Sequence, residues 1–140
     1  MEKIDKFDGA YAFLSNFYPS VVCDPEGIAY PTVEHYFQAM KTVYLSKRKE
    51  IAAAPTPGTA KRMGRRVLLR SDWNDIRVEV MRRGLKQKFA NPDLRKKLLA
   101  TGNAELIEGN WWNDTFWGVC NGVGENHLGK LLMEIRSEIL

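Results

Sequence analysis

Residues 30–41 read YPTVEHYFQAMK and predict the first helix of the chain, beginning near Thr32. On such a helix Glu34, Gln38 and Lys41 fall on one line, because side chains three and four positions apart share a face. The neighbouring apolar stripe comprises Val33, Tyr36, Phe37, Met40 and Tyr44. The stretch therefore places a carboxylate in the first helical turn, which is either a solvated surface group or the acid/base group of a site.

The rest of the chain alternates short strand patterns with amphipathic helices. Strands are predicted at 3–7, 20–23, 28–30 and 104–108, and further helices at 46–53, 58–66, 72–89, 92–100 and 127–140. Residues 109–126 are predicted to form a long ordered loop. With 140 residues, this order favours an α+β fold, a helix-rich single domain over residues 1–140 with a small antiparallel sheet.

Composition excludes several classes of protein. Hydrophobic residues make up 44% of the chain, and no apolar run approaches the ~20 residues of a membrane span. The N-terminal MEKIDKFDG is charged and unlike a signal peptide, so we expect a cytoplasmic protein without a membrane partner. Cys23 and Cys120 lack metal-ligand spacing, and we expect both to be reduced. The oligomeric state stays open.

The chain is moderately basic, with a net charge of +4 that suits an anionic partner such as a phosphate, a nucleotide or nucleic acid. Most basic clusters, including Lys47–Arg48–Lys49, are interpreted as solvated helix faces. Arg77 falls inside the apolar stripe of the helix predicted over 72–89. Since an unpaired buried charge is costly, Arg77 either bonds helix ends or a carboxylate, or it clamps a phosphate or substrate.

Carboxylates and tryptophans are the most prominent candidates for chemistry. Asp114 in the loop is either a turn or cap residue or part of a site, and the Trp117 indole suits stacking on a base or ribose. The loop glycines match no phosphate-binding motif, and His35 and His127 alone cannot form a zinc site. Glu34 and Asp114, with Lys41, Arg65 and Arg77 as cations, suit glycosyl hydrolysis, although composition alone does not select that reaction.

Six segments occur in the same order as in a known family: FLSNFYPS (13–20), YPTVEHYFQAMK (30–41), AKRMGR (60–65), VMRRGLKQKF (80–89), NPDLRKKLLATG (91–102) and NDTFWG with NHLGKLLMEIR (113–136). From about residue 7 to its end, the chain resembles the NADAR, or YbiA-like, family of N-glycosidases. The resemblance implies an α+β, mostly helical single domain without metal, and no cofactor is expected.

The resemblance also implies a reaction, the hydrolysis of the bond between ribose C1 and an exocyclic or amino nitrogen. Family substrates are ribosylated bases of two kinds. One is ADP-ribosylated guanine, in a nucleotide or within DNA or RNA. The other is a phosphoribosylamino-pyrimidine intermediate of riboflavin synthesis. The same cations and tryptophans would equally serve a non-catalytic module that binds NAD or ADP-ribose, and this alternative stays open.

Carried over by motif, Glu34 is the catalytic carboxylate, and Trp73 and Asp114 match positions that the family associates with the active site. Further matches, expected to bind substrate together with Trp73 and Arg77, are Asn16, Gln38, Lys41, Arg65 and Trp117. The chain departs from the family after Trp117–Gly118, where Val119–Cys120 replace a step that is often rich in glycine or aspartate.

Overall fold

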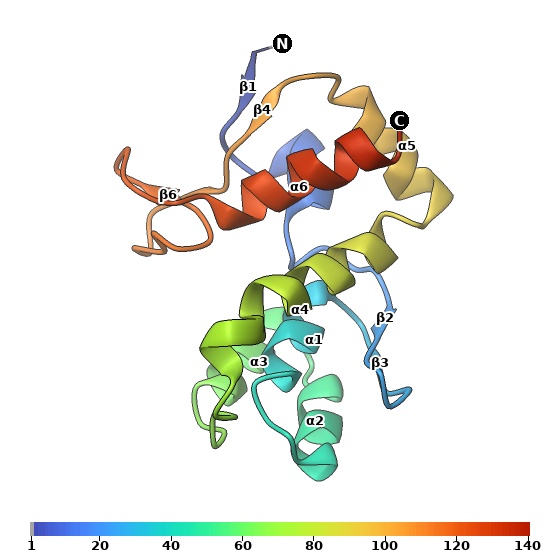
Figure 1. Cartoon of the computed structure of the whole chain (residues 1–140), viewed down its shortest axis with the longest axis vertical. Coiled ribbons are helices and arrows are strands. Elements are labelled where there is room, and N and C mark those ends of the chain that lie inside the picture. Colours follow the sequence, from blue (N-terminus) through green and yellow to red (C-terminus); the bar gives the residue numbers. More distant parts are fainter. Residues whose placement is uncertain (1) are drawn as a thin grey trace. The chain divides into compact units, whose positions relative to one another are not determined.

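The computed structural model describes residues 2–140, most of which lie in helices or in the turns that join them (Figure 1). A 3₁₀ helix η1 (Gly9–Leu14) precedes six α-helices: α1 (Val33–Ala39), α2 (Leu45–Ala52), α3 (Pro57–Gly64), α4 (Trp73–Lys88), α5 (Pro92–Ala100) and α6 (His127–Glu138). The prediction of a helix-rich α+β fold is confirmed, and each predicted helix is present within a few residues of its expected ends.

The strands are only two residues long and form three separate pairs. β2 (Val22–Cys23) pairs antiparallel with β3 (Ala29–Tyr30), as in the predicted antiparallel sheet. In contrast, β1 (Lys3–Ile4) with β4 (Glu105–Leu106), and β5 (Gly109–Asn110) with β6 (Val119–Cys120), run parallel. β5 and β6 lie in the stretch that was predicted to be a loop, and Val119–Cys120 are therefore strand residues.

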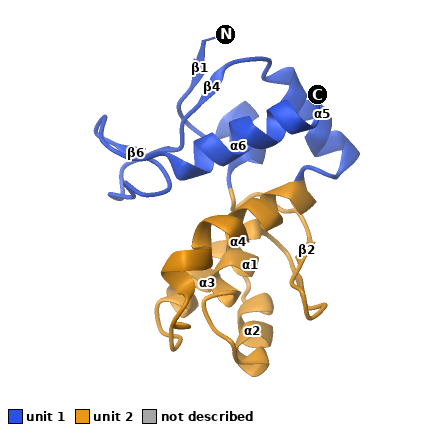
Figure 2. Cartoon of the chain, viewed as in Figure 1, with its two compact units in different colours: residues 1–15, 89–140 blue, residues 16–88 orange. Residues whose placement is uncertain are grey.

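The contacts divide the chain into two compact units (Figure 2). One unit runs up to Ser15 and resumes over Phe89–Leu140; its core includes Leu14, Leu98, Leu106, Leu132 and Ile135. The other unit is Asn16–Lys88, in which α1 packs against α2, α3 and α4. A single domain over residues 1–140 stays a prediction from the sequence.

The first helix is shorter than its sequence pattern predicted. α1 ends at Ala39 with Met40 as its C-cap, and the backbone turns where the Thr42 N–H donates to the Ala39 carbonyl. The prediction that Tyr44 belongs to the apolar stripe of this helix is wrong, because Tyr44 is the N-cap residue of α2 and is 54% exposed. The later apolar positions of a repeating pattern can thus lie beyond the helix end.

No helix within residues 2–140 is long and apolar enough to cross a membrane. Two features of the fold had no counterpart in the sequence prediction, the 3₁₀ helix η1 and the β5–β6 pair. The 3₁₀ helix leaves no hydrophobic period in the sequence, and β5 and β6 pair residues ten positions apart, which no local pattern specifies.

Candidate active site

Glu34 lies in the first turn of α1, where the sequence predicted it. The helix begins because the Thr32 hydroxyl accepts the His35 N–H (3.1 Å), and the Glu34 N–H donates to the Asn16 carbonyl (3.1 Å). The whole of α1 is buried, and Glu34 itself is only 8% exposed. The interpretation of Glu34 as a solvated surface group is therefore wrong, and a buried carboxylate needs partners.

Gln38 supplies one such partner from the next turn of α1. Its Nε2 donates to Glu34 Oε2 at 2.6 Å, which fixes the orientation of the Gln38 amide. The amide lies against Gly64 at the end of α3, where a Cβ atom would come within 2.0 Å of Gln38 Oε1. The absence of a side chain at Gly64 therefore creates the space that lets Gln38 reach Glu34.

Two residues that bond Glu34 each have a buried side-chain oxygen without a hydrogen-bond partner among residues 2–140. The two oxygens are Gln38 Oε1, and Oδ1 of Asn16, whose Nδ2 contacts Met81 Sδ at 3.5 Å. Unsatisfied buried acceptors are rare in folded proteins and often belong to functional sites. Asn16 and Gln38, both predicted to bind substrate, thus lie beside Glu34.

Two aromatic rings lie next to Lys41, one from α1 and one from the start of α4. The Phe37 ring of α1 contacts the Trp73 ring at the start of α4, with centroids 5.0 Å apart, and both rings are almost fully buried. Lys41 Nζ lies 5.8 Å from the centroid of the Phe37 ring. Trp73 was predicted as a site residue, and the structure shows that its ring packs against the ring of Phe37.

Three cations from two segments lie near one another, and one of them, Lys41, interacts with the Glu34 carboxylate. Burial lowers the pKa of Lys41, the nearby Glu34 carboxylate acts in the opposite direction, and the positive charges of Arg65 and Lys61 lower this pKa further. Lys41, Arg65 and Lys61 are therefore close enough to repel one another, so an anion among them would relieve the repulsion. Lys61 was not predicted as a site residue, although it lies one helical turn before Arg65 on α3.

Arg77 lies on α4 and is half-buried, and it interacts with other groups of the protein. This agrees with its position inside an apolar stripe, where an arginine requires partners. Glu34 belongs to the unit Asn16–Lys88, whereas the other two predicted residues, Asp114 and Trp117, belong to the compact unit that includes Phe89–Leu140. There, Asp114 Oδ1 accepts the Trp117 N–H at 2.9 Å, and Asn110 bonds both the N–H and the carbonyl of Asp114. Asp114 thus acts as a turn residue in this structure, and its second carboxylate oxygen takes no part in the hydrogen bond to the Trp117 N–H.

Sequence reasoning missed the burial of three cations, Arg48, Lys88 and Arg136, of which the first two lie in the unit of Glu34. Arg48, interpreted as part of a solvated cluster, is 4% exposed; it donates to the Thr42 carbonyl and pairs with Glu26 at 2.8 Å and with Asp24 at 3.7 Å. Lys88 on α4 is fully buried. Each lies three residues from a buried apolar residue of its own helix, Ile51 or Leu85, and this spacing could have identified both.

His35 has a structural role, and no role is evident for the two cysteines. His35 Nε2 donates to the Ala54 carbonyl (3.0 Å), so its Nδ1 accepts from the Thr32 hydroxyl (2.8 Å). Cys23 is exposed and Cys120 is buried, and both are reduced thiols. Within residues 2–140, no group of three or more His, Cys, Asp or Glu side chains has the arrangement of a metal site.

Comparison with known proteins identifies one family and several relatives. A family model described as the NADAR domain matches residues 4–140. The N-glycosidase YbiA of Escherichia coli (strain K12) is 42% identical over 135 residues, covering 92% of this chain and 82% of that protein. An N-glycosidase of Nostoc punctiforme is 40% identical over 136 residues, covering 92% and 86%.

A riboflavin biosynthesis protein of Vibrio vulnificus is also 40% identical over 136 residues, although these cover only 36% of that protein. The NMR structure of the E. coli protein YbiA superposes with a TM-score of 0.84 at 39% identity, covering 99% of this chain and 86% of that chain.

Proposed function

Because the chain belongs to the NADAR family, we propose that it is an N-glycosidase, a hydrolase that cleaves a bond between ribose C1 and a nitrogen atom. The resemblance noted in the sequence is confirmed at the level of the family. One observation carries the proposal to this chain: the buried Glu34 carboxylate, held by Gln38 at 2.6 Å, lies with an aromatic pair and with Lys41.

In the proposed reaction, Glu34 orients a water molecule and accepts one of its protons. The water oxygen forms a bond to ribose C1, and the C1–N bond breaks with its electron pair passing to the nitrogen, which takes up a proton. Charge that develops on the ribose at this point resembles an oxocarbenium ion, which a nearby carboxylate stabilises. Gln38 keeps the carboxylate in one orientation throughout.

Two substrates fit this chemistry. One is ADP-ribosylated guanine, free or in nucleic acid, and the other is a phosphoribosylamino-pyrimidine of riboflavin synthesis. Relatives named as riboflavin biosynthesis proteins support the second. Both carry phosphate, for which Lys41 and Arg65 are the proposed ligands, each charge-assisted contact contributing about 1.5–3 kcal/mol. Trp73 would line the sugar or base, and Asn16 would bond a polar group of the substrate.

The family resemblance implies Asp114 and Trp117 as site residues, and Arg77 is proposed from its position inside the apolar stripe of α4. Asp114 would bond ribose hydroxyls or share the water, Trp117 would stack on the departing ring, and Arg77 would bind phosphate. The family model spans both compact units, which supports one functional domain over residues 1–140. A cytoplasmic location stays a prediction from the sequence.

The decisive test compares the wild type with Glu34→Gln on both substrates, with the released base and sugar read by mass. Glutamine keeps the shape of the side chain but cannot take the proton, so we expect the rate to fall by about 10²–10⁴. Glu50→Gln is the matched control, since Glu50 is exposed on α2 and pairs only at the surface with Lys47.

Thermal unfolding of both variants distinguishes lost chemistry from lost structure. Unchanged turnover in Glu34→Gln would remove Glu34 from the mechanism. Wild-type protein that binds ADP-ribose but releases no base from either substrate would instead identify a non-catalytic binding module.

A further inference from the structure

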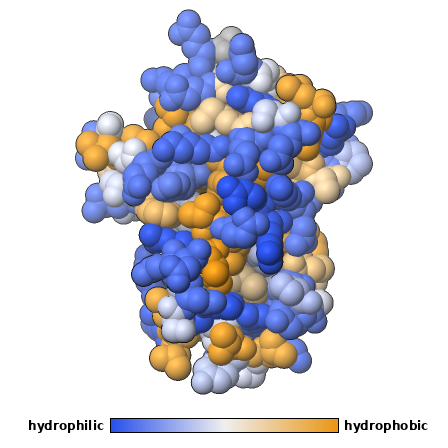
Figure 3. Space-filling view, viewed as in Figure 1, coloured by the Kyte–Doolittle hydropathy of each residue, from blue (hydrophilic) through white to orange (hydrophobic). Residues whose placement is uncertain are grey.

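The Asn110 side chain, on β5, closes the loop that carries Asp114. Its Oδ1 accepts the Asp114 N–H at 3.0 Å, and its Nδ2 donates to the Asp114 carbonyl at 2.9 Å. The two indoles between these residues contribute little burial, because Trp111 is 86% exposed and Trp112 is 46% exposed. Apolar groups are left among hydrophilic ones in Figure 3 where Figure 1 labels β6. The Asn110 amide, rather than apolar packing, therefore fixes the backbone of Asp114.

Glu108 fixes this amide in turn. Asn110 Nδ2 also donates to Glu108 Oε2 at 2.8 Å. The backbone of Glu108 is held on both sides, since its N–H donates to Asn126 Oδ1 at 3.0 Å and its carbonyl accepts the Val119 N–H at 2.8 Å. A flipped Asn110 amide would direct its oxygen at two acceptors, the Glu108 carboxylate and the Asp114 carbonyl. Only one orientation of the amide is therefore compatible with its neighbours.

Gly118 leaves the space in which this contact forms. A Cβ atom at Gly118 would overlap Glu108 Oε2 and would lie 2.8 Å from Asn110 Nδ2. An amide packed beside a glycine is also the arrangement of Gln38 and Gly64. Each amide therefore has a fixed place, and each serves one of the two candidate catalytic carboxylates.

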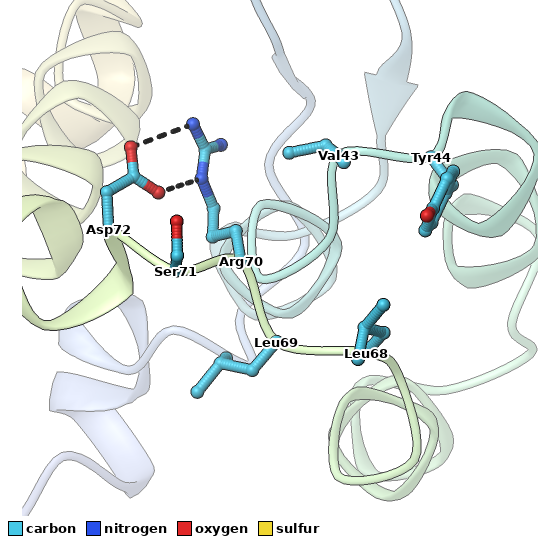
Figure 4. A pocket seen from close by; sticks show the side chains of 7 residues that line it. All are labelled: Val43, Tyr44, Leu68, Leu69, Arg70, Ser71 and Asp72. Carbon is cyan, nitrogen blue, oxygen red and sulfur yellow. Dashed lines mark hydrogen bonds and ion pairs between the residues drawn. The ribbon is translucent and has the colours of Figure 1, made fainter.

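Asp114 lies in a stretch of the chain without cations. Residues 98–129 contain neither Lys nor Arg, and the Asp114 carboxylate accepts the Trp117 N–H through Oδ1. Asp72 of the other unit differs, because both of its oxygens accept from the Arg70 guanidinium at the edge of a surface cavity of about 420 Å³ (Figure 4). A carboxylate whose loop is held by neutral amides keeps its charge for a ribose hydroxyl or a water molecule, whereas an arginine offsets the charge of its partner.

We propose that Asn110 is the positioning residue of the Asp114 carboxylate and that Glu108 anchors Asn110 for this purpose. Asn110 acts through Asp114 and not on the substrate. It keeps the loop closed, so that Oδ1 of Asp114 stays on the Trp117 N–H and the second oxygen keeps one position. The inference rests on the proposed N-glycosidase function, in which Asp114 bonds ribose hydroxyls or shares the water.

Steady-state kinetics of Asn110→Ala test this role on the substrate that the wild type hydrolyses. Misplacing a catalytic group by about 1 Å costs on the order of 10²-fold in rate, so kcat should fall about 10- to 100-fold while KM changes little. Asn103→Ala is the matched control, since Asn103 is an exposed residue of the turn that follows α5 in the same unit. Its kcat should equal that of the wild type.

Two substitutions of Glu108 separate its acceptor oxygen from its charge. Glu108→Gln keeps an oxygen that can accept from Asn110 Nδ2, so kcat should stay within about threefold of the wild-type value. Glu108→Ala removes the acceptor, and kcat should fall as in Asn110→Ala. This variant also provides the test if Asn110→Ala does not fold, because it loosens the amide without removing it.

Combining Asn110→Ala with Asp114→Asn shows whether the two residues act as one. If Asn110 acts through the Asp114 carboxylate, its removal should lower the kcat of Asp114→Asn by less than about twofold. Full multiplication of the two losses would overturn the proposal, because Asn110 would then act through another group.

Hydrogen exchange of the Trp117 backbone amide gives a readout that does not depend on hydrolysis. This amide donates to Asp114 Oδ1, so its exchange should be about tenfold faster in Asn110→Ala than in the wild type and unchanged in Asn103→Ala. If the protection is lost in Asn110→Ala but the wild type hydrolyses neither substrate, the N-glycosidase proposal fails while the anchoring of Asp114 by Asn110 stands.

Two further results would overturn the positioning role while leaving the glycosidase intact. One is an Asn110→Ala protein that loses the protection of the Trp117 amide but keeps the wild-type kcat, since the position of Asp114 would then not matter. The other is a fully protected Trp117 amide with a reduced kcat, since the loss would then not come from a displaced carboxylate.

Discussion

Lys88 presents a buried amine on α4, with its Nζ 5.7 Å from the centroid of the Tyr18 ring. Burial lowers the pKa of this amine from 10.5 to about 7. Between these two values the unfolded chain binds a proton that the folded chain does not, so the free energy of unfolding should rise with pH. The slope from this one group reaches at most ~1.4 kcal/mol per pH unit.

Urea unfolding of the wild type and of Lys88→Met between pH 7 and about 10 measures this contribution. The variant removes the titrating group at similar length, so the difference in unfolding free energy should shrink steadily as the pH rises. Burial raises the pKa of Tyr30 and Tyr36, so their titration lowers the free energy of unfolding near pH 10, opposite to the effect of Lys88. Both tyrosines are present in the wild type and in the variant, so their contribution cancels in the difference. A pH-independent difference would mean that Lys88 titrates normally.

Gly64 tests whether the orientation of Glu34 matters. In Gly64→Ala the new methyl group would overlap Gln38 Oε1, and the amide would have to leave Glu34. Losing a hydrogen bond to a charged group costs about 1.5–3 kcal/mol, so kcat should fall roughly 10- to 150-fold while KM changes little. Gly58→Ala is the control, because its methyl group would meet only ordinary contacts at 3.8 and 3.9 Å on the same helix.

Gln38→Ala should reproduce the kinetic defect of Gly64→Ala, and combining the two substitutions should add little to it. Additive losses in the double variant would show that Gly64 acts through some other group, since residues in one pathway are not additive.

At the scale of elements, the start of α1 depends on a single hydroxyl. Thr32 Oγ1 accepts the His35 N–H and donates to His35 Nδ1, and both residues are buried. Thr32→Ala removes the helix cap, worth ~1 kcal/mol, and leaves the ring nitrogen unsatisfied, worth ~1–3 kcal/mol more. Denaturant unfolding should therefore show a loss of about 2–4 kcal/mol, largely restored in Thr32→Ser.

Thr56, the N-cap residue of α3, provides the control for Thr32→Ala. It caps α3 by accepting the Thr59 N–H, but it is exposed and bonds no histidine. Thr56→Ala should therefore cost only the cap contribution. Equal losses at the two positions would mean that the His35 ring contributes nothing to the stability of α1.

These elements also show what the sequence could predict. Thr32 and the Asn91–Pro92 pair have local cap chemistry, and the structure confirms both as helix starts, with Asn91 accepting the Asp93 and Leu94 N–H groups. In contrast, β5 and β6 exist because Gly109 and Val119 meet across an intervening loop. No local pattern specifies a two-residue pair of this kind, so the strands could not be predicted.

At the scale of the whole molecule, the candidate site was predictable where it lies on one helix. Glu34 and Gln38 share α1, and their spacing alone brings them together. Gly64 and Lys61 reach the same cluster through the packing of α3 on α1, which the sequence does not specify. Asp114 and Trp117 belong to the other unit, and their proposed roles come from the chemistry of a carboxylate and an indole and from the family resemblance.

The distribution of charge over the molecule leads to a last prediction. The chain carries 21 Lys and Arg against 17 Asp and Glu, and two of the cations, Lys61 and Arg65, lie near Lys41, which interacts with Glu34. Salt screens their attraction for phosphate, so kcat/KM for a phosphorylated substrate should fall several-fold between about 0.05 M and about 0.5 M salt.

Lys61→Ala should weaken this dependence on salt. Lys3→Ala, which removes an exposed lysine paired with Asp5, should leave it unchanged. The corresponding ribosylamine without phosphate should show little dependence on salt; if both substrates respond equally, salt is acting on the fold, and the cations are not phosphate ligands.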